Sequence, residues 1–212
     1  MTGLWIVIAV VVVLAIAFIA SYNRFVRQRN LVQESWRQVD VELNRRHDLI
    51  PNLVETVKGY ATQERTVLQA VTEARTAAVT AAQSSASGVA AQAEAENTLG
   101  RALNGLFAVA ENYPDLKSSQ NFLALQQQLA ETEDRIAAGR RFYNSNVRAL
   151  NTRVEAFPSS FIAWMFNFRK ADYFEVDDPA VRAPVAVDFS SLTPSPPAPP
   201  SAPAPQTGQA PS

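Results

Sequence analysis

Residues 4–20 form one unbroken apolar run, and this run restricts the possible folds of the chain more than any other feature. No charged side chain appears before Arg24. A helix over the uncharged window, residues 2–23, would be roughly 33 Å long, enough to cross the ~30 Å hydrocarbon core of a bilayer. Trp5 and Tyr22 lie near its two ends, where interfacial aromatic residues are enriched. These features predict a transmembrane helix that contacts the bilayer through residues 4–20.

The first arginines indicate how this helix is oriented. Arg24, Arg27 and Arg29 follow the apolar run, whereas only the terminal amine precedes it. Because basic residues are retained on the cytoplasmic side, we expect the N-terminus outside and the rest of the chain in the cytoplasm. A cleaved signal peptide is the alternative, since residues 15–17 read Ala-Ile-Ala. The missing basic n-region and the length of the run favour an uncleaved anchor over residues 1–23.

After the anchor, apolar residues recur at alternating spacings of four and three, which predicts helices with one buried face. Glycine is scarce, with 7 residues, and this also favours helix over sheet. The helical tracts run from the anchor to Leu43, from Leu53 to about Gln83, from about Val89 to Tyr113, and from about Ser118 to Phe157. The joints are short, so the fold class we predict is all-α, with an antiparallel four-helix bundle over residues 24–169.

Pro51 separates the first two tracts and allows two interpretations. Proline is tolerated at the first position of a helix but costs about 3 kcal/mol or more in a helix interior. Ile50, which precedes it, is biased away from helical geometry. We therefore predict a turn at residues 48–51. The alternative is a longer helix that only kinks at Pro51.

The character of the chain changes from Lys170 onward. Residues 170–193 are expected to form an extended acidic segment, in which residues 185–189 could dock on the bundle. Residues 194–212 contain most of the chain's 13 prolines, together with alanine and serine. Such a composition cannot bury a core, so we predict a disordered tail with polyproline-II character.

Composition excludes most catalytic chemistry. The chain has no cysteine and one histidine, His47, which rules out thiolate and di-iron sites and leaves zinc without ligands. No Gly-x-Ser-x-Gly elbow or phosphate-binding loop is present. The net charge is −1 and the basic residues are scattered, so no nucleic acid partner is expected. We predict no enzyme activity and no cofactor, and we expect His47 to be exposed or to lie at a helix corner, hydrogen-bonded to backbone.

Several polar positions are expected to make structural or partner contacts. Glu64 falls on an apolar stripe and could pair with an arginine of a neighbouring helix, such as Arg75, which would fix helix register; an ion or ligand site is the alternative. The aromatic residues of segment 161–168 are expected to pack on the core, with a groove or a lipid contact as alternatives. The candidate positions are Asp40, Arg46, Asp48, Pro51, Glu64, Arg140, Arg141 and Tyr143.

Residues 36–61, which include the run Arg-Arg-His-Asp-Leu-Ile-Pro-Asn at 45–52, closely resemble the LemA family of bacterial membrane proteins. Shorter matches occur at residues 22–24, 113–116, 140–147 and 157–160, and the resemblance extends over residues 1–189. The Pro-rich tail departs from the family pattern. The resemblance implies a single-pass protein of the bacterial inner membrane with a cytoplasmic helical bundle. It implies no established enzyme activity, cofactor or catalytic residue.

These observations favour a membrane-tethered scaffold or adaptor that recruits unidentified membrane or cytoplasmic proteins. Similar domains in magnetosome membrane proteins favour a role in membrane organisation. One alternative is a membrane-bound enzyme or ion-binding protein that uses carboxylates such as Glu64, Asp40 and Asp48. Another is membrane remodelling through the apolar segment at 161–168.

Overall fold

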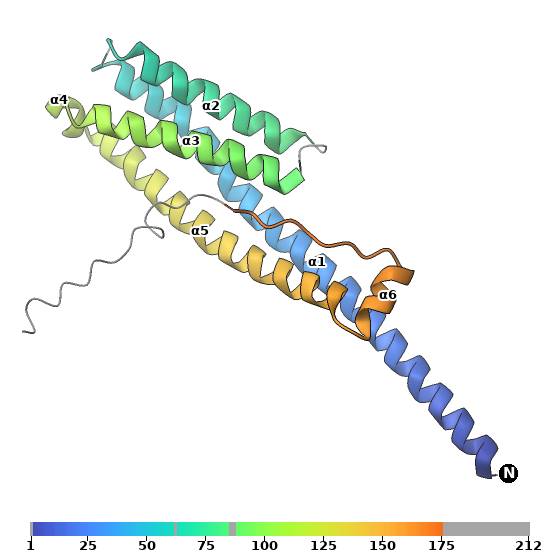
Figure 1. The fold of residues 1–212 in the computed structure, drawn as a ribbon. Helices are drawn as coiled ribbons and strands as arrows, with labels where there is room; N and C mark the ends of the chain where they lie inside the picture. The colour runs from blue at the N-terminus through green and yellow to red at the C-terminus, as the bar shows by residue number, and fades with distance from the viewer. Residues whose placement is uncertain (1, 62, 85–87, 176–212) are drawn as a thin grey trace, which may run out of the picture. The chain divides into compact units, whose positions relative to one another are not determined.

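The computed structural model describes residues 2–61, 63–84 and 88–175, which belong to one compact unit. Within these residues the chain is helical, without a strand, and the long helices run antiparallel to their chain neighbours (Figure 1). This confirms the predicted fold class. The helices are α1 (Thr2–Lys58), α2 (Arg65–Gln83), α3 (Gly88–Ala110), α4 (Pro114–Lys117), α5 (Gln120–Glu155) and α6 (Ser159–Met165).

The N-terminal part of α1 extends beyond the bundle, and it is long and apolar enough to cross a membrane. Its large apolar side chains between Leu4 and Ile19 are exposed, apart from Phe18, which is half-buried against the proximal end of the bundle. Exposed aliphatic side chains in such a row are unfavourable in water but match the hydrocarbon interior of a bilayer. The helix that we predicted as a membrane anchor is therefore present as a candidate span, and it continues without a break into the bundle.

The predicted turn at residues 48–51 is wrong. Helix α1 passes through Pro51 and ends at Lys58, and the chain reverses between Gly59 and Glu64. Leu53 and Val57, which we assigned to a second helix, are buried residues of α1. The bundle still has four long helices, because the break between the first and the second lies later in the chain than predicted.

Two hydrophobic cores lie one after the other along the bundle. The proximal core, nearer the anchor, is formed mainly by α1, α5 and α6; it includes Phe25, Val32, Val39, Leu43, Ile136, Tyr143, Val147 and Ile162. The distal core joins the end of α1 to α2, α3 and the start of α5; it includes Ile50, Leu53, Val57, Val71, Leu99, Leu106, Phe122 and Leu129. Each fully buried side chain of this size contributes about 1.5–3 kcal/mol to stability.

The chain after α6 packs back along the bundle. Asn167 has a positive φ of 54°, which asparagine tolerates, and it reverses the chain direction. Residues 168–175, called the strap below, then run beside α5 (Figure 1). Asn151 and Asn144, two helical turns apart on α5, each exchange two hydrogen bonds of 2.9–3.0 Å with the strap backbone. The two asparagine amides thus satisfy backbone N–H and C=O groups of the strap, which has no helical hydrogen bonds of its own.

The strap also closes the proximal core. Phe174 is fully buried and packs edge-on against Trp36, with ring centroids 5.3 Å apart. Trp36 in turn lies 5.2 Å from the ring of Tyr143. The predicted docking of residues 185–189 and the predicted disorder of residues 194–212 lie outside the described residues.

Candidate functional site

Buried polar side chains form a layer between the two hydrophobic cores. Arg46 and His47 of α1, Glu96 of α3 and Thr132 of α5 are each at most 4% exposed. On every one of these helices, the polar residue comes after a residue of one core and before a residue of the other. The layer therefore crosses the bundle at one level and joins three helices.

The carboxylate of Glu96 is the centre of this layer. Its Oε1 atom lies 2.9 Å from Nε2 of His47, and its Oε2 atom accepts a hydrogen bond from Nη2 of Arg46. Nη1 of Arg46 donates to Glu133 of α5. Because an ionised carboxylate only accepts hydrogen bonds, Nε2 of His47 must carry a proton. The carboxylate of Glu96 thus binds two basic side chains of α1, and one of them, Arg46, also binds Glu133 of α5.

Burial and pairing act in opposite directions on these groups. Burial alone would raise the pKa of Glu96, but the hydrogen bond from His47 and the charge of Arg46 outweigh it and lower that pKa. Burial alone would lower the pKa of Arg46, yet Glu133 and Glu96 raise it. Both groups are therefore held in their charged forms. A buried pair of this kind is costly to break, because the remaining charge has no partner.

Pro51 affects the polar layer because it lacks the backbone N–H that would bond to the carbonyl oxygen of His47. In an uninterrupted helix the N–H of residue 51 would donate to the carbonyl oxygen of His47, four residues earlier. Proline has no N–H. Instead, Nε of Arg75 on α2 donates to that oxygen at 2.7 Å. The proline thus leaves a carbonyl open, and the neighbouring helix uses it.

The sequence reasoning misplaced His47 and missed Glu96. His47 was expected to be exposed or at a helix corner, with a hydrogen bond to backbone. It is 2% exposed, lies inside the continuous helix α1 and is hydrogen-bonded to a side chain of α3, so that prediction is wrong. Glu96 precedes Leu99 by three positions and Leu103 by seven, so it occupies the buried stripe of α3. A carboxylate on such a stripe was the available signal, and it was noted for Glu64 alone.

Glu64 has a different role from the one expected. It stands at the N-cap position of α2 and accepts a hydrogen bond of 3.3 Å from the hydroxyl group of Tyr113. Arg75, one of the arginines that could have paired with Glu64, donates instead to the carbonyl oxygen of His47. Glu64 therefore contributes to the end of the distal bundle and not to the polar layer.

The other candidate positions lie at separate places on the bundle. Tyr143 belongs to the proximal core, and its hydroxyl group donates to the carbonyl oxygen of Asp172 at 2.8 Å. Burial, with the charge of Asp172, raises the pKa of Tyr143 to about 12. The remaining side chains are at the surface: Asp48, Pro51 and Arg141 are exposed, and Asp40 and Arg140 are half-buried. Of the eight candidates, Arg46 is a member of the polar layer, and Pro51 acts on it by leaving the carbonyl oxygen of His47 open to Arg75.

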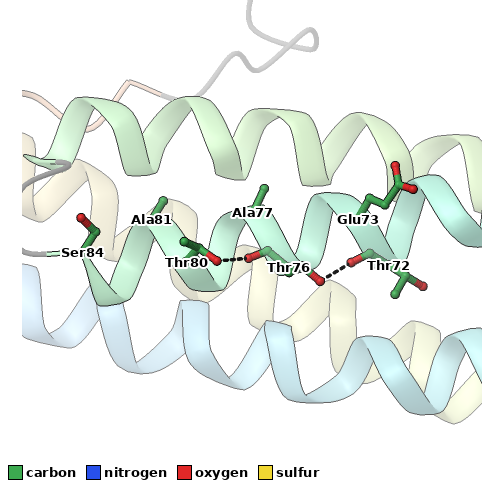
Figure 2. A pocket seen from close by; sticks show the side chains of 7 residues that line it. All are labelled: Thr72, Glu73, Thr76, Ala77, Thr80, Ala81 and Ser84. Atoms are coloured by element: carbon green, nitrogen blue, oxygen red, sulfur yellow. Dashed lines mark hydrogen bonds between the residues drawn. The ribbon is translucent and has the colours of Figure 1, made fainter.

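A surface groove along α2 is a further candidate site. Figure 2 shows its lining, which is Thr72, Glu73, Thr76, Ala77, Thr80, Ala81 and Ser84. The three threonine hydroxyl groups donate to the backbone carbonyl four residues earlier, so they are already committed. Glu73 is the one ionisable residue of this lining, and one carboxylate gives no acid–base pair. In the described part of the chain, no group of three or more His, Cys, Asp or Glu side chains could hold a metal ion.

The fold and the site together define a class of protein, namely helical bundles with an N-terminal helix suited to a membrane and a charge-paired layer in the interior. This chain belongs to the LemA family, whose family model matches residues 35–189. It is 28% identical over 206 residues to magnetosome protein MamQ 2 of Paramagnetospirillum magneticum, which covers 84% of this chain and 75% of that protein. It is 26% identical over 214 residues to magnetosome protein MamQ of Magnetospirillum gryphiswaldense, covering 88% and 78%. Protein LemA of Metamycoplasma hominis is 24% identical over 161 residues, covering 76% and 72%.

The pairing of Glu96 predicts a pH-dependent contribution to stability. Its pKa is lower in the folded than in the unfolded chain, so the contribution is present at neutral pH and is lost as the pH falls through the folded-state value. We expect Glu96→Gln to lower the free energy of unfolding by about 3 kcal/mol at pH 7, and by progressively less as the pH falls through the lowered folded-state pKa of Glu96. Denaturant unfolding of the detergent-solubilised protein measures this. The control Glu94→Gln, exposed on the same helix, should change little; equal losses in both variants would contradict the buried role of Glu96.

The contact between Arg75 and the His47 carbonyl predicts an energetic coupling with Pro51. Arg75→Ala should cost about 1.5–3 kcal/mol, because it leaves that carbonyl without a partner. In a Pro51→Ala background the loss should be clearly smaller, since residue 51 then has an N–H for the same oxygen. A double-mutant cycle of unfolding free energies measures the difference. Arg101→Ala, at an exposed site of α3, should show no coupling with Pro51→Ala. If Arg75→Ala and Pro51→Ala are also uncoupled, Arg75 does not replace the backbone hydrogen bond that Pro51 lacks.

Proposed function

We propose that this protein is a membrane-anchored scaffold or adaptor, which holds partner proteins at a membrane and catalyses no reaction itself. One observation carries the proposal: among the residues that the structure describes, the buried basic and acidic side chains Arg46, His47 and Glu96 are paired with one another. Glu96 binds Arg46 and His47, and Arg46 also binds Glu133. Groups committed in this way stabilise a bundle, whereas a catalytic acid or base must reach a substrate.

The family membership agrees with this reading. The matched relatives named magnetosome proteins are, by that name, parts of a larger cellular structure. A role within an assembly requires a stable surface and a fixed location. The bundle supplies the surface through the exposed faces of α2, α3 and α5, and the apolar start of α1 supplies the location.

The orientation follows from the distribution of charge. Arg24, Arg27 and Arg29 lie on the bundle side of the apolar run. The bias supports an N-terminus outside the cell's inner membrane and a bundle in the cytoplasm. The partners of the scaffold are then membrane proteins or cytoplasmic proteins that reach the bundle surface.

The orientation can be tested with reporters fused after residue 212. We expect a green fluorescent protein fusion to fluoresce and an alkaline phosphatase fusion to be inactive, because phosphatase folds only outside the cytoplasm. As a matched comparison, Arg24→Gln, Arg27→Gln and Arg29→Gln together should weaken the bias and yield some phosphatase activity. Strong phosphatase activity from the unaltered chain would reverse the proposed orientation.

The scaffold role predicts specific neighbours on the bundle surface. A photo-crosslinking amino acid at the exposed positions Thr76, Arg101 and Arg141 samples one face each of α2, α3 and α5. In living cells we expect at least one position to give discrete adducts, with the same proteins recovered from repeated membrane preparations. The other positions serve as matched controls, since a true partner contacts one face. No reproducible adduct from any face would count against a scaffold.

A further inference from the structure

Helix α6 and the residue before its first turn carry exposed aromatic side chains. Phe157 is 89% exposed and Trp164 is 79% exposed, and Phe161 lies beside Trp164 with ring centroids 6.0 Å apart. The opposite side of α6 is buried, since Ile162 and Ala163 belong to the proximal core. The helix is therefore apolar on two sides. Leaving the second side in water opposes the burial that drives folding, at about 25 cal/mol for each Å² of apolar surface.

The position of α6 is set by contacts with the anchor. The ring of Phe166, which directly follows α6, lies 5.9 Å from that of Phe18 and 4.7 Å from that of Tyr22. Phe18 is within the apolar run at residues 4–20. A membrane that covers this run must end near Tyr22, just before the first arginine. Helix α6 therefore lies at the level where the anchor leaves the hydrocarbon.

Basic side chains lie on the bundle side of this level. Arg24 and Arg153 are near enough to repel, and burial together with the charge of Arg24 lowers the pKa of Arg153. Nε of Arg153 is buried without a hydrogen-bond partner among the described residues. Arg29 lies over the ring of Phe168, 5.6 Å from its centroid. Basic side chains beside an exposed apolar surface are typical of segments that lie in a membrane interface.

We propose that α6, with Phe157, Phe161 and Trp164, inserts into the interface of the same lipid leaflet from which the anchor emerges. The bilayer is the occupant of this surface, because the surface is continuous with the anchor through Phe166. The proposal rests on the membrane anchoring in the proposed function and adds a second contact to it. A single spanning helix can rotate and tilt, whereas two contacts at one level hold the bundle in one orientation to the membrane.

The absence of cysteine from the chain allows a direct test with single spin labels. The full chain is reconstituted into vesicles of phosphatidylglycerol and phosphatidylethanolamine, with a nitroxide at Trp164→Cys or Phe161→Cys. Collision of the label with oxygen, which concentrates in lipid, is compared with collision with a water-soluble nickel complex. Phe142→Cys is the matched control, since Phe142 on α5 is 52% exposed and Phe161 is 55% exposed. Leu14→Cys reports on the anchor itself.

We expect the labels at 161 and 164 to collide more with oxygen than with nickel, as at position 14, and the label at 142 to show the reverse. All four positions are exposed, so the variants should melt at the temperature of the unaltered protein. If positions 161 and 164 behave like 142 while position 14 is in lipid, the interfacial contact is disproved and the anchor stands. If position 14 is also in water, the membrane anchoring fails, and the inference fails with it.

Discussion

The arrangement of the bundle depends on one buried carboxylate. Glu96 pairs with Arg46 and His47, and without it two basic groups of α1 would be left in the interior with little water to solvate them. Because the three side chains meet only when α1 and α3 are aligned at one level, their pairing selects that alignment. The apolar contacts in the proximal and distal cores select the alignment of the helices less strictly, since Leu, Ile and Val side chains can pack in several registers. The polar layer thus fixes the register of α1 and α3, and the two hydrophobic cores supply most of the stability.

The run Arg-Arg-His-Asp-Leu-Ile-Pro-Asn at residues 45–52 can be explained by the same layer. Arg46 and His47 provide two side chains to Glu96, and His47 also provides a carbonyl oxygen to Arg75. That oxygen is available because Pro51 has no N–H to occupy it. One turn of α1 therefore contacts α2 through its backbone and α3 through its side chains. The run looks like a catalytic motif because it concentrates charge, but its groups are used to join helices.

Features that depend on local sequence could be predicted, whereas features that depend on contacts with residues of other helices could not. The apolar run, the helical periodicity and the break at Pro114 are properties of neighbouring residues, and the structure contains each of them. The turn at Pro51 was predicted from an intrinsic cost that Arg75, 24 positions later, helps to offset. His47 was expected at the surface because its partner Glu96 belongs to another helix. A periodicity that marks the buried face of one helix does not reveal which buried polar residue on another helix lies opposite.

The continuity of α1 then has a mechanical consequence for a scaffold. With 57 residues the helix is about 85 Å long, of which the apolar start takes about 33 Å, so about 50 Å of helix would separate the distal end of α1 from a membrane that covers that start. Its weakest point should be Pro51, where a backbone hydrogen bond is missing. Pro51 lies at the edge of the polar layer. There Arg75 replaces the missing hydrogen bond, and Glu96 binds Arg46 and His47 in the preceding turn. The strap reinforces the proximal half in a similar way, because Asn144 and Asn151 tie it to α5. A bundle supported at both places can hold a bound protein at a defined distance from the bilayer, and this requires stiffness but no reactive group.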